Sequence, residues 1–418
     1  MQAVPPGSHL ISQARRSLGE IPCRSAHDHI STFCRNCQGF INHSEREREK
    51  DGAHLTCHAS SSARSVTAAG ASWPRVVSAC LDQLEPLPLG ATLGVAYFGE
   101  QLAPMADAIL GALRARTGVP RWLGAGGSAV LTGHQGERED GLGVLVAALP
   151  ADGFRVALSL RASLARPGLV LAHAALDEAD PAGLLGELAR NAPAAVVGGL
   201  AAAARAPVHL AGELAAGSAV SLALREDVPA VAGLARACAP LGPTHRITSA
   251  SGSLILALDG QPALEVMAGE MGDLFRFAGA RATRQLWVAD AVAAEEAGLR
   301  VRRVTAVDPE RGALRVGGGR LDSHVRLMRP DPAGSLARLG ELARDLRARL
   351  GGKEPSCGLY LSSRFRGREL FGPGVSELAV LREELGAIPL IGLVTDAEIF
   401  AGALHECAGI LVLMGEGT

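Results

Sequence analysis

Aromatic residues are scarce in this sequence: they make up 3% of its 418 residues, and only two of them are tyrosines and three are tryptophans. Hydrophobic residues nevertheless account for 48% of the chain and charged residues for 20%, which is typical of a globular protein. The core must therefore be built mainly from leucine, valine and alanine. A chain of this length can form two or three domains and a large core.

A strong excess of one charge is also missing, as is a long apolar run. The formal net charge is -2, which gives no reason to expect nucleic acid or an anionic membrane as a partner. The longest apolar run, residues 192–204, is shorter than the roughly 20 residues that a membrane-spanning helix needs. No apolar stretch follows Arg15 and Arg16, so a secretory signal is not predicted. We therefore expect a cytoplasmic protein whose eight cysteines are reduced thiols.

The sequence lacks the motifs that mark common catalytic and cofactor sites. It contains no GxSxG nucleophile motif, no HExxH zinc motif and no phosphate loop ending in GKS or GKT. The glycine-rich stretch at residues 124–128 could cradle a phosphate, but without those features it is more typical of a tight turn. No carboxylate or nucleophile stands at a diagnostic spacing from the histidines of the main part of the chain, which are His173, His209, His245, His324 and His405. These absences predict a protein without a cofactor and without catalysis.

Residues 1–70 differ in composition from the rest of the chain, because they hold half of the cysteines and little leucine. One interpretation is a small zinc site. Cys34 and Cys37 have the two-residue gap that lets two thiolates bind one metal, and the second pair of ligands would come from Cys23, Cys57 or a histidine. The other interpretation, which we favour, is a disordered segment or upstream sequence translated from an over-extended start. Too few large apolar residues are present there to offset the entropy of ordering.

From about residue 73, short apolar runs alternate with segments of helical periodicity. Strands are predicted at residues 91–98, 144–148, 154–160, 194–197, 220–224, 253–258, 359–365 and 389–394. Helices are predicted at residues 102–113, 332–350 and 377–385. Asp331 followed by Pro332 is typical of a helix start, and Ser376 is a second capping residue. The pattern predicts a mixed α/β fold with many strands.

Three segments of the chain together resemble one known family. The first is RACAPLGPTHRITSASG at residues 236–252, followed by LDGQPAL. The second is VRLMRPDP at residues 325–332, and the third is LSSRFRGRELFG at residues 361–372, followed by Glu377, IPLIG and Glu398. This order resembles the FIST sensory domain family, with its N-terminal and C-terminal parts in tandem over roughly residues 90–405.

The resemblance implies two FIST-type domains whose multi-stranded sheets pack against flanking helices, at residues 71–285 and 286–418. It implies a stand-alone protein of the bacterial type that binds a small molecule such as an amino acid, without catalysis. Such a protein would act in signal transduction through a protein partner. The alternative is an interaction adaptor that uses the FIST fold and binds no small ligand. The family usually has cysteine where this sequence has Ser363, so we expect no cysteine-based chemistry there.

The third segment supplies the candidate ligand-binding residues. If residues 359–365 continue as an extended strand, Arg364 and Arg366 point to the same face. A guanidinium group can hold a carboxylate through two parallel hydrogen bonds, so one of these arginines would bind the carboxylate of an amino acid. The amine of the ligand would then lie against the carboxylate of Glu377 or Glu398. Ser362 and Ser363 would add hydroxyl contacts. The structural alternative is a solvated loop with an acidic residue in the first turn of a helix.

Overall fold

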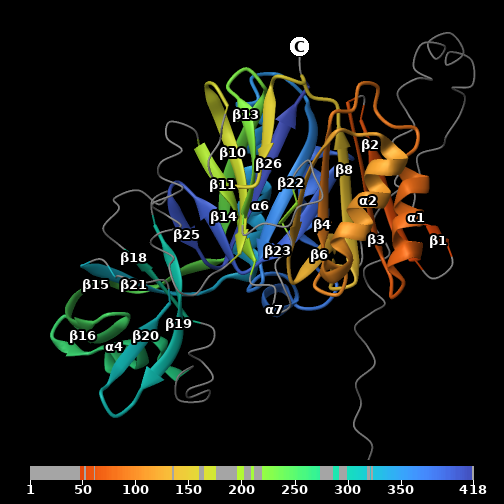
Figure 1. Ribbon diagram of the computed structural model, residues 1–418. Coiled ribbons are helices and arrows are strands. Elements are labelled where there is room, and N and C mark those ends of the chain that lie inside the picture. The colour runs from red at the N-terminus through yellow and green to blue at the C-terminus, as the bar shows by residue number, and fades with distance from the viewer. Residues whose placement is uncertain are drawn as a thin grey trace, which may run out of the picture. The chain divides into compact units, whose positions relative to one another are not determined.

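The computed structural model describes residues 48–50, 53–60, 62–133, 136–159, 164–175, 195–201, 209–210, 219–273, 286–290, 299–317, 321 and 323–416. Their strands form four sheets, and helices cover the outer faces of two of them (Figure 1). The predicted mixed α/β class is therefore confirmed. Among the described helices, none combines the length and apolar character needed to cross a bilayer.

The first sheet lies beneath two helices. Its strands run in the order β1 (Arg48–Lys50), β2 (Ala53–Ala59), β3 (Ala63–Ala69), β8 (Gly141–Ala147), β4 (Leu93–Phe98), β5 (Arg121–Gly126) and β12 (His209–Leu210). The covering helices are α1 (Trp73–Leu84) and α2 (Ala106–Thr117), which follows the short helix η1 (Ala103–Met105). Because β4 and β5 are parallel, α2 serves as the crossover between them. A cluster of buried side chains that includes Ile109 and Trp122 joins these helices to the sheet.

Strands β2 and β3 belong to the first sheet, so the prediction that residues 1–70 lie outside the fold is wrong for these two strands. β3 pairs along its whole length with β8, and Val66 is fully buried. The sequence did not reveal this role, because small and polar residues alternate with apolar ones and leave no apolar run. Val66 and Ala68 pack with α1, whereas Ser65 accepts a hydrogen bond from the N–H of Leu390. Residues 1–47 lie outside the described part of the chain.

Two further sheets combine strands from distant parts of the sequence. One has the order β25 (Ala403–His405), β24 (Ala397–Phe400), β11 (Ala195–Ala201), β10 (Pro167–Ala175), β13 (Ala219–Arg225) and β9 (Phe154–Ala157). The other has the order β14 (Ala230–Arg236), β26 (Ala408–Gly415), β22 (Pro355–Ser363), β23 (Leu390–Thr395), β6 (Ala129–Thr132) and β7 (Gly136–Arg138). Each sheet thus contains strands from both predicted domains.

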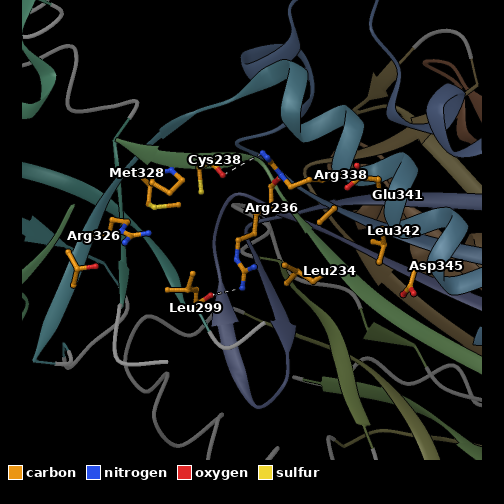
Figure 2. Close-up of a pocket in the computed structure, with 13 residues that line it drawn as sticks. Leu234, Arg236, Cys238, Leu299, Arg326, Met328, Arg338, Glu341, Leu342 and Asp345 are labelled. Atoms are coloured by element: carbon orange, nitrogen blue, oxygen red, sulfur yellow. Dashed lines mark hydrogen bonds between the residues drawn. The ribbon is translucent and has the colours of Figure 1, made fainter. Parts of the chain in front are cut away.

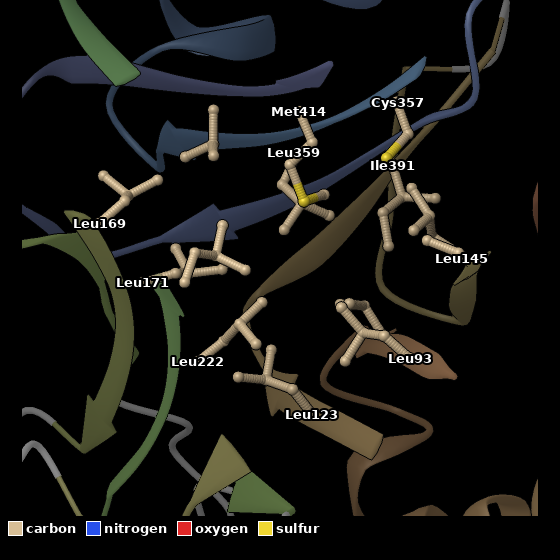
Figure 3. Packing of buried hydrophobic residues seen from close by; sticks show 14 of the residues in the cluster. Leu93, Leu123, Leu145, Leu169, Leu171, Leu222, Cys357, Leu359, Ile391 and Met414 are labelled. Carbon is tan, nitrogen blue, oxygen red and sulfur yellow. The ribbon is translucent and has the colours of Figure 1, made fainter. Parts of the chain in front are cut away.

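The three sheets share one apolar core. Figure 3 shows leucines from the first two of these sheets facing Leu359, Ile391 and Met414 of the third. Leu93 and Leu222 in this cluster are exposed by no more than 1%. The outer face of the third sheet is covered by α6 (Pro332–Arg349) and α8 (Glu377–Leu385).

A fourth sheet has its own small core. Its order is β15 (Cys238–Ser251), β21 (His324–Pro330), β18 (Trp287–Asp290), β19 (Val301–Asp308), β20 (Ala313–Val316), β16 (Leu254–Leu258) and β17 (Gln261–Pro262). β15 also pairs with β16, so the strands form a closed ring. Its core includes Met267 of α4 (Ala263–Met271). The register of β15 against β21 shifts between Pro240 and Thr244, where the two prolines and a glycine of the first segment break the regular pairing.

The helix caps predicted from the sequence are present. The Asp331 side chain accepts a hydrogen bond from the backbone N–H of Gly334 at the start of α6. The Ser376 side chain accepts one from the N–H of Ala379 at the start of α8. The cap at Ser376 fixes the position of the first residue of α8, Glu377, which belongs to the site described next.

Candidate functional site

Strand β22 ends at Ser363, two residues earlier than predicted. The backbone N–H of Arg366 donates to the carbonyl of Ser363 at 2.8 Å, which closes a turn, and the short helix α7 (Gly367–Phe371) follows. Because the chain turns there, Arg364 and Arg366 do not share a strand face, and that prediction is wrong. The two arginines go to different environments.

Arg366 is completely buried and paired with Glu377, which is 3% exposed. Arg366 Nε donates to Glu377 Oε1 at 2.7 Å, and Nη1 donates to the carbonyl of Ala235 at 3.1 Å. Tyr360 donates its hydroxyl to the same Oε1 at 2.8 Å, and Ser362 donates to Oε2 at 2.6 Å. Burial lowers the pKa of Arg366, but Glu377 outweighs this effect and holds that pKa above its usual value. Ser362, Arg366 and Glu377 therefore do come together, bound to one another.

Glu398 and Ser363 are fully buried, and each accepts hydrogen bonds from neighbouring residues of the fold. Thr395 donates its hydroxyl to Glu398 Oε1 at 3.0 Å, and the N–H of Ala408 donates to Oε2 at 3.3 Å. Burial raises the pKa of Glu398 well above its usual value, which favours the neutral acid. Ser363 accepts a hydrogen bond from the N–H of Cys407 at 3.1 Å. Both predicted site residues are fully buried.

Arg364 lies apart from this network. Its side chain is 55% exposed and pairs with Asp396 at 2.8 Å. The guanidinium also lies 5.5 Å from the centre of the Phe365 ring. Arg364 is thus the most accessible of the six predicted residues, and it lines a different cavity, which is considered below.

A cavity of about 480 Å³ lies between strands β6 and β7 and the segment from Gly367 to Glu377. Its polar lining comes from Ser128, Thr132, Glu137, Glu139, Arg368, Ser376 and Glu377. This volume falls within the usual range for pockets that bind small molecules. Glu377 belongs to both the buried network and the wall of the cavity, and Arg366 holds its carboxylate in place.

Glu137 is the residue of this cavity that the sequence did not reveal. Its Oε1 atom is buried, and within the described part of the chain it has no hydrogen-bond partner. Burial, together with repulsion from Glu377, raises the pKa of Glu137 to about 7, although the backbone N–H of Arg368 opposes the shift. A Cβ atom at Gly367 would lie 1.4 Å from Glu137 Oε1, so glycine is required there. Glu137 stands in a short polar strand with no motif around it, and no pattern could have singled it out.

The raised pKa predicts a pH-dependent stability. Between its ordinary pKa of 4.5 and its folded-state pKa of about 7, Glu137 holds a proton in the folded state that the unfolded state releases. Its contribution to stability is therefore fully present below pH 4.5 and is lost as the pH rises through 7. Relative to Glu137→Gln, we expect the wild type to lose on the order of 1 kcal/mol of unfolding free energy from about pH 5 to about pH 8. Urea denaturation at several pH values measures this, and parallel curves for the two proteins would contradict the assignment.

A third cavity, of about 520 Å³, lies where β14 runs into β15, and Figure 2 shows its lining residues. Two of its arginines already bind backbone groups. Arg338 Nε donates to the carbonyl of Arg236 at 3.0 Å, and Arg236 Nη2 donates to the carbonyl of Leu299 at 2.9 Å. Arg338 also pairs with Asp331 at 3.0 Å. These bonds fasten α6 to β14, and we interpret this cavity as structural.

One histidine has carboxylate partners that its sequence position did not suggest. His245 Nδ1 lies 2.7 Å from Asp259, and Nε2 lies 2.6 Å from Glu270. Burial lowers the pKa of His245, but the two carboxylates outweigh it and the net shift is upward, which favours the imidazolium. In the described part of the chain both ring nitrogens bond to carboxylates, so this cluster ties β15 to α4 and contains no nucleophile.

The predicted zinc site falls mostly on residues that the structure does not describe, namely Cys23, Cys34 and Cys37. Cys57 belongs to β2, where it is 9% exposed and its thiol donates to the carbonyl of Gln83 at 3.3 Å. Among the described residues, no group of three or more histidine, cysteine and acidic side chains has a geometry that could hold a metal ion.

Comparison with known proteins gives two kinds of match. The chain is 28% identical to Uncharacterized protein Mb0898c of Mycobacterium bovis over 194 residues, which are 43% of this chain and 49% of that protein. It is 27% identical to Uncharacterized protein Rv0628c of Mycobacterium tuberculosis over 183 residues, which are 41% of this chain and 46% of that protein. The matches thus span about half the length of these relatives.

The models of two protein domains match most of the chain. The FIST N domain matches residues 92–261, and the FIST C domain matches residues 263–401. The predicted boundary after residue 285 stays a prediction. Glu137 lies in the first matched segment and Glu377 in the second, so the 480 Å³ cavity is built by both. Because these matches cover well over half of its length in tandem, the chain belongs to the FIST family.

Proposed function

We propose that this protein is a sensor that binds a small ligand bearing an ammonium group in the cavity between Glu137 and Glu377. FIST domains are associated with sensory roles in signal transduction, and neither match points to an enzyme family. The observation that carries the proposal is Glu137 itself. A carboxylate with a buried oxygen that lacks a hydrogen bond, next to a second carboxylate, is stabilised by a cation placed between the two.

An amino acid matches the charges of this cavity. Its ammonium group would lie against Glu137 and Glu377, and its carboxylate would pair with Arg368, which lines the same cavity. Arg366 would not touch the ligand. It would act as a positioning residue, because its bonds to Glu377 fix the direction of that carboxylate. This proposal keeps Glu377 from the six predicted residues and replaces the predicted arginines with Arg368.

The position of the cavity suggests how binding would be transmitted. Glu137 is on β7, within the FIST N match, and Glu377 begins α8, within the FIST C match. A ligand that pairs with both carboxylates would remove their repulsion and draw α8 toward β7. A signalling partner that reads the position of α7 and α8 would then distinguish the bound from the free state.

Thermal unfolding of the full chain against a panel of amino acids and simple amines tests the proposal. At about 10 mM, a ligand with a Kd of about 1 mM adds about 1.4 kcal/mol of stability. We expect at least one amino acid to raise the Tm of the wild type and to have no effect on Glu137→Gln. The change preserves the size of the side chain and removes its charge.

The matched control is Glu310→Gln, because Glu310 is exposed on a turn of the fourth sheet. It should respond to the ligand as the wild type does. A ligand shift that persists in Glu137→Gln would place binding elsewhere. No shift with any compound would reject the sensor and favour the adaptor, which a reproducible protein partner in affinity capture would then support.

A further inference from the structure

A cavity of about 540 Å³ is lined in part by the segment that contains α7. It is lined by side chains from β18, β19 and the turn after β22, including Trp287, Arg303, Arg364, Phe365, Glu369 and Leu370. The buried cluster of Trp287, Val301 and Cys407, with Phe365 and Leu370 packed against it, joins these elements. This cavity does not include Glu137 or Glu377, so it is separate from the proposed ammonium site.

Arg303 contributes a positive charge to the wall of this cavity. Its guanidinium carbon lies 4.7 Å from the centre of the Phe365 ring. Its backbone N–H donates to Glu406 Oε2 at 2.7 Å, but within the described part of the chain its side chain forms no ion pair, and Nε is buried without a hydrogen bond. A guanidinium on a cavity wall whose N–H donors are not taken up by hydrogen bonds is suited to bind an anion.

Trp287 provides a second unused donor. Its side chain is almost fully buried, since the residue is 4% exposed, and Nε1 has no acceptor among the residues that the structure describes. Buried indole N–H groups usually find a partner. An oxyanion in the cavity would supply acceptors for both Trp287 and Arg303.

The other charges around the cavity favour an anion with a single charge. Arg364 also lines it, but this arginine is already paired with Asp396 at 2.8 Å. Glu369 stands on the wall, and Glu406 lies beneath Arg303. The positive charge of Arg303 is therefore already partly offset by Glu406, and a doubly charged group such as phosphate would be repelled more strongly by these carboxylates than a carboxylate ligand would be. Phe365, Leu370 and the two prolines of the wall, Pro330 and Pro332, offer apolar contacts.

We propose that this cavity binds a small organic acid, with its carboxylate held by Arg303 and the indole N–H of Trp287 and its apolar body against Leu370 and the prolines. Arg364, which stacks on Phe365, also lines this cavity. The segment from Arg364 to Leu370 thus borders this site as well as the ammonium site, which involves Gly367 and Arg368.

Isothermal titration calorimetry of the full chain with benzoate, acetate and inorganic phosphate tests this proposal. We expect benzoate to bind more tightly than acetate, and phosphate to bind weakly or not at all. Arg303→Met keeps an unbranched side chain over Phe365 and removes the charge, and it should weaken benzoate binding roughly ten-fold or more. Trp287→Phe keeps a ring and removes the N–H, and it should weaken binding by roughly three- to ten-fold.

The control is Arg315→Met, at an exposed arginine of β20 in the same sheet, which should bind benzoate as the wild type does. Circular dichroism verifies that each variant is folded, and Arg303→Lys provides a second substitution that keeps the charge but loses the planar fork. Benzoate binding that is absent from the wild type, or unchanged in both Arg303 variants, would overturn the proposal. Phosphate that binds as tightly as benzoate and is lost in Arg303→Met would overturn the assignment to a monocarboxylate.

Discussion

Replacing Arg366 with alanine should destabilise the protein by about 3–5 kcal/mol, because it leaves Glu377 as a buried charge without a positive partner. The guanidinium is completely buried and holds Glu377 Oε1 at 2.6 and 2.7 Å. It also satisfies the carbonyl of Ala235, which joins the turn after β22 to the end of β14. Alanine would therefore lose an ion pair, a backbone contact and much of the packing at once. Urea denaturation at neutral pH measures the loss.

Two comparisons separate the charge effect from a general packing effect. Arg364→Ala removes a neighbouring arginine from an exposed ion pair with Asp396 and should change stability by less than about 1 kcal/mol. In the double variant Arg366→Met with Glu377→Gln, the unpaired charge is gone, so stability should recover in part relative to Arg366→Met alone. Equal stability of Arg366→Ala and Arg364→Ala would show that the buried pair does not stabilise the fold.

Gly198→Ala should have an effect of similar size through close packing alone. Gly198 is on β11, opposite Ala172 of the parallel strand β10. A Cβ atom at this position would lie 1.8 Å from the carbonyl oxygen of Ala172, and that atom is backbone and cannot rotate away. The two strands would have to separate, so we expect a loss of about 3 kcal/mol or more. A Cβ atom at the next residue, Gly199, would be too close to the side chain of Thr395. The two glycines therefore allow β11 to approach Thr395, whose hydroxyl bonds to Glu398.

Gly111→Ala is the matched control for this prediction. Gly111 is within α2, and a Cβ atom there would meet nothing within 4 Å. Because alanine favours the helix more than glycine does, the substitution should raise stability by up to about 1 kcal/mol. Thermal unfolding of the two variants side by side should therefore give opposite signs. A stable Gly198→Ala protein would mean that β10 and β11 can move apart freely.

The sequence predicted those elements whose signal is local. Helices α6 and α8 have apolar periodicity and capping side chains, and both begin at the predicted residues. Strands β4 and β23 are continuous apolar runs, and both are buried at every position. Each of these patterns depends on neighbouring residues, so it can be read without knowing what lies across the core.

The parts of the site that depend on distant contacts were not predictable. The turn at Arg366 is set by bonds to Ala235 and Glu377, so a continuous strand through Arg364 was a reasonable but wrong expectation. Glu137 acquires its properties from Glu377 and from burial against Gly367, more than 200 residues away. Predicting Glu377 was possible because it begins a recognisable helix within a segment that resembles the family, although its partner Tyr360 was missed.

The pairing of β14 with β26 has a consequence for synthesis on the ribosome. β14 ends at Arg236, and its partner is complete only at Gly415. Because a ribosome adds about 5–20 residues per second, β14 stays unpaired along this edge for roughly 10 to 35 seconds until β26 has been synthesised. β6 and β11 likewise wait for β23 and β24. The nascent chain therefore exposes several unpaired apolar edges until the last strands emerge, so we expect a single late folding step rather than domain-by-domain folding.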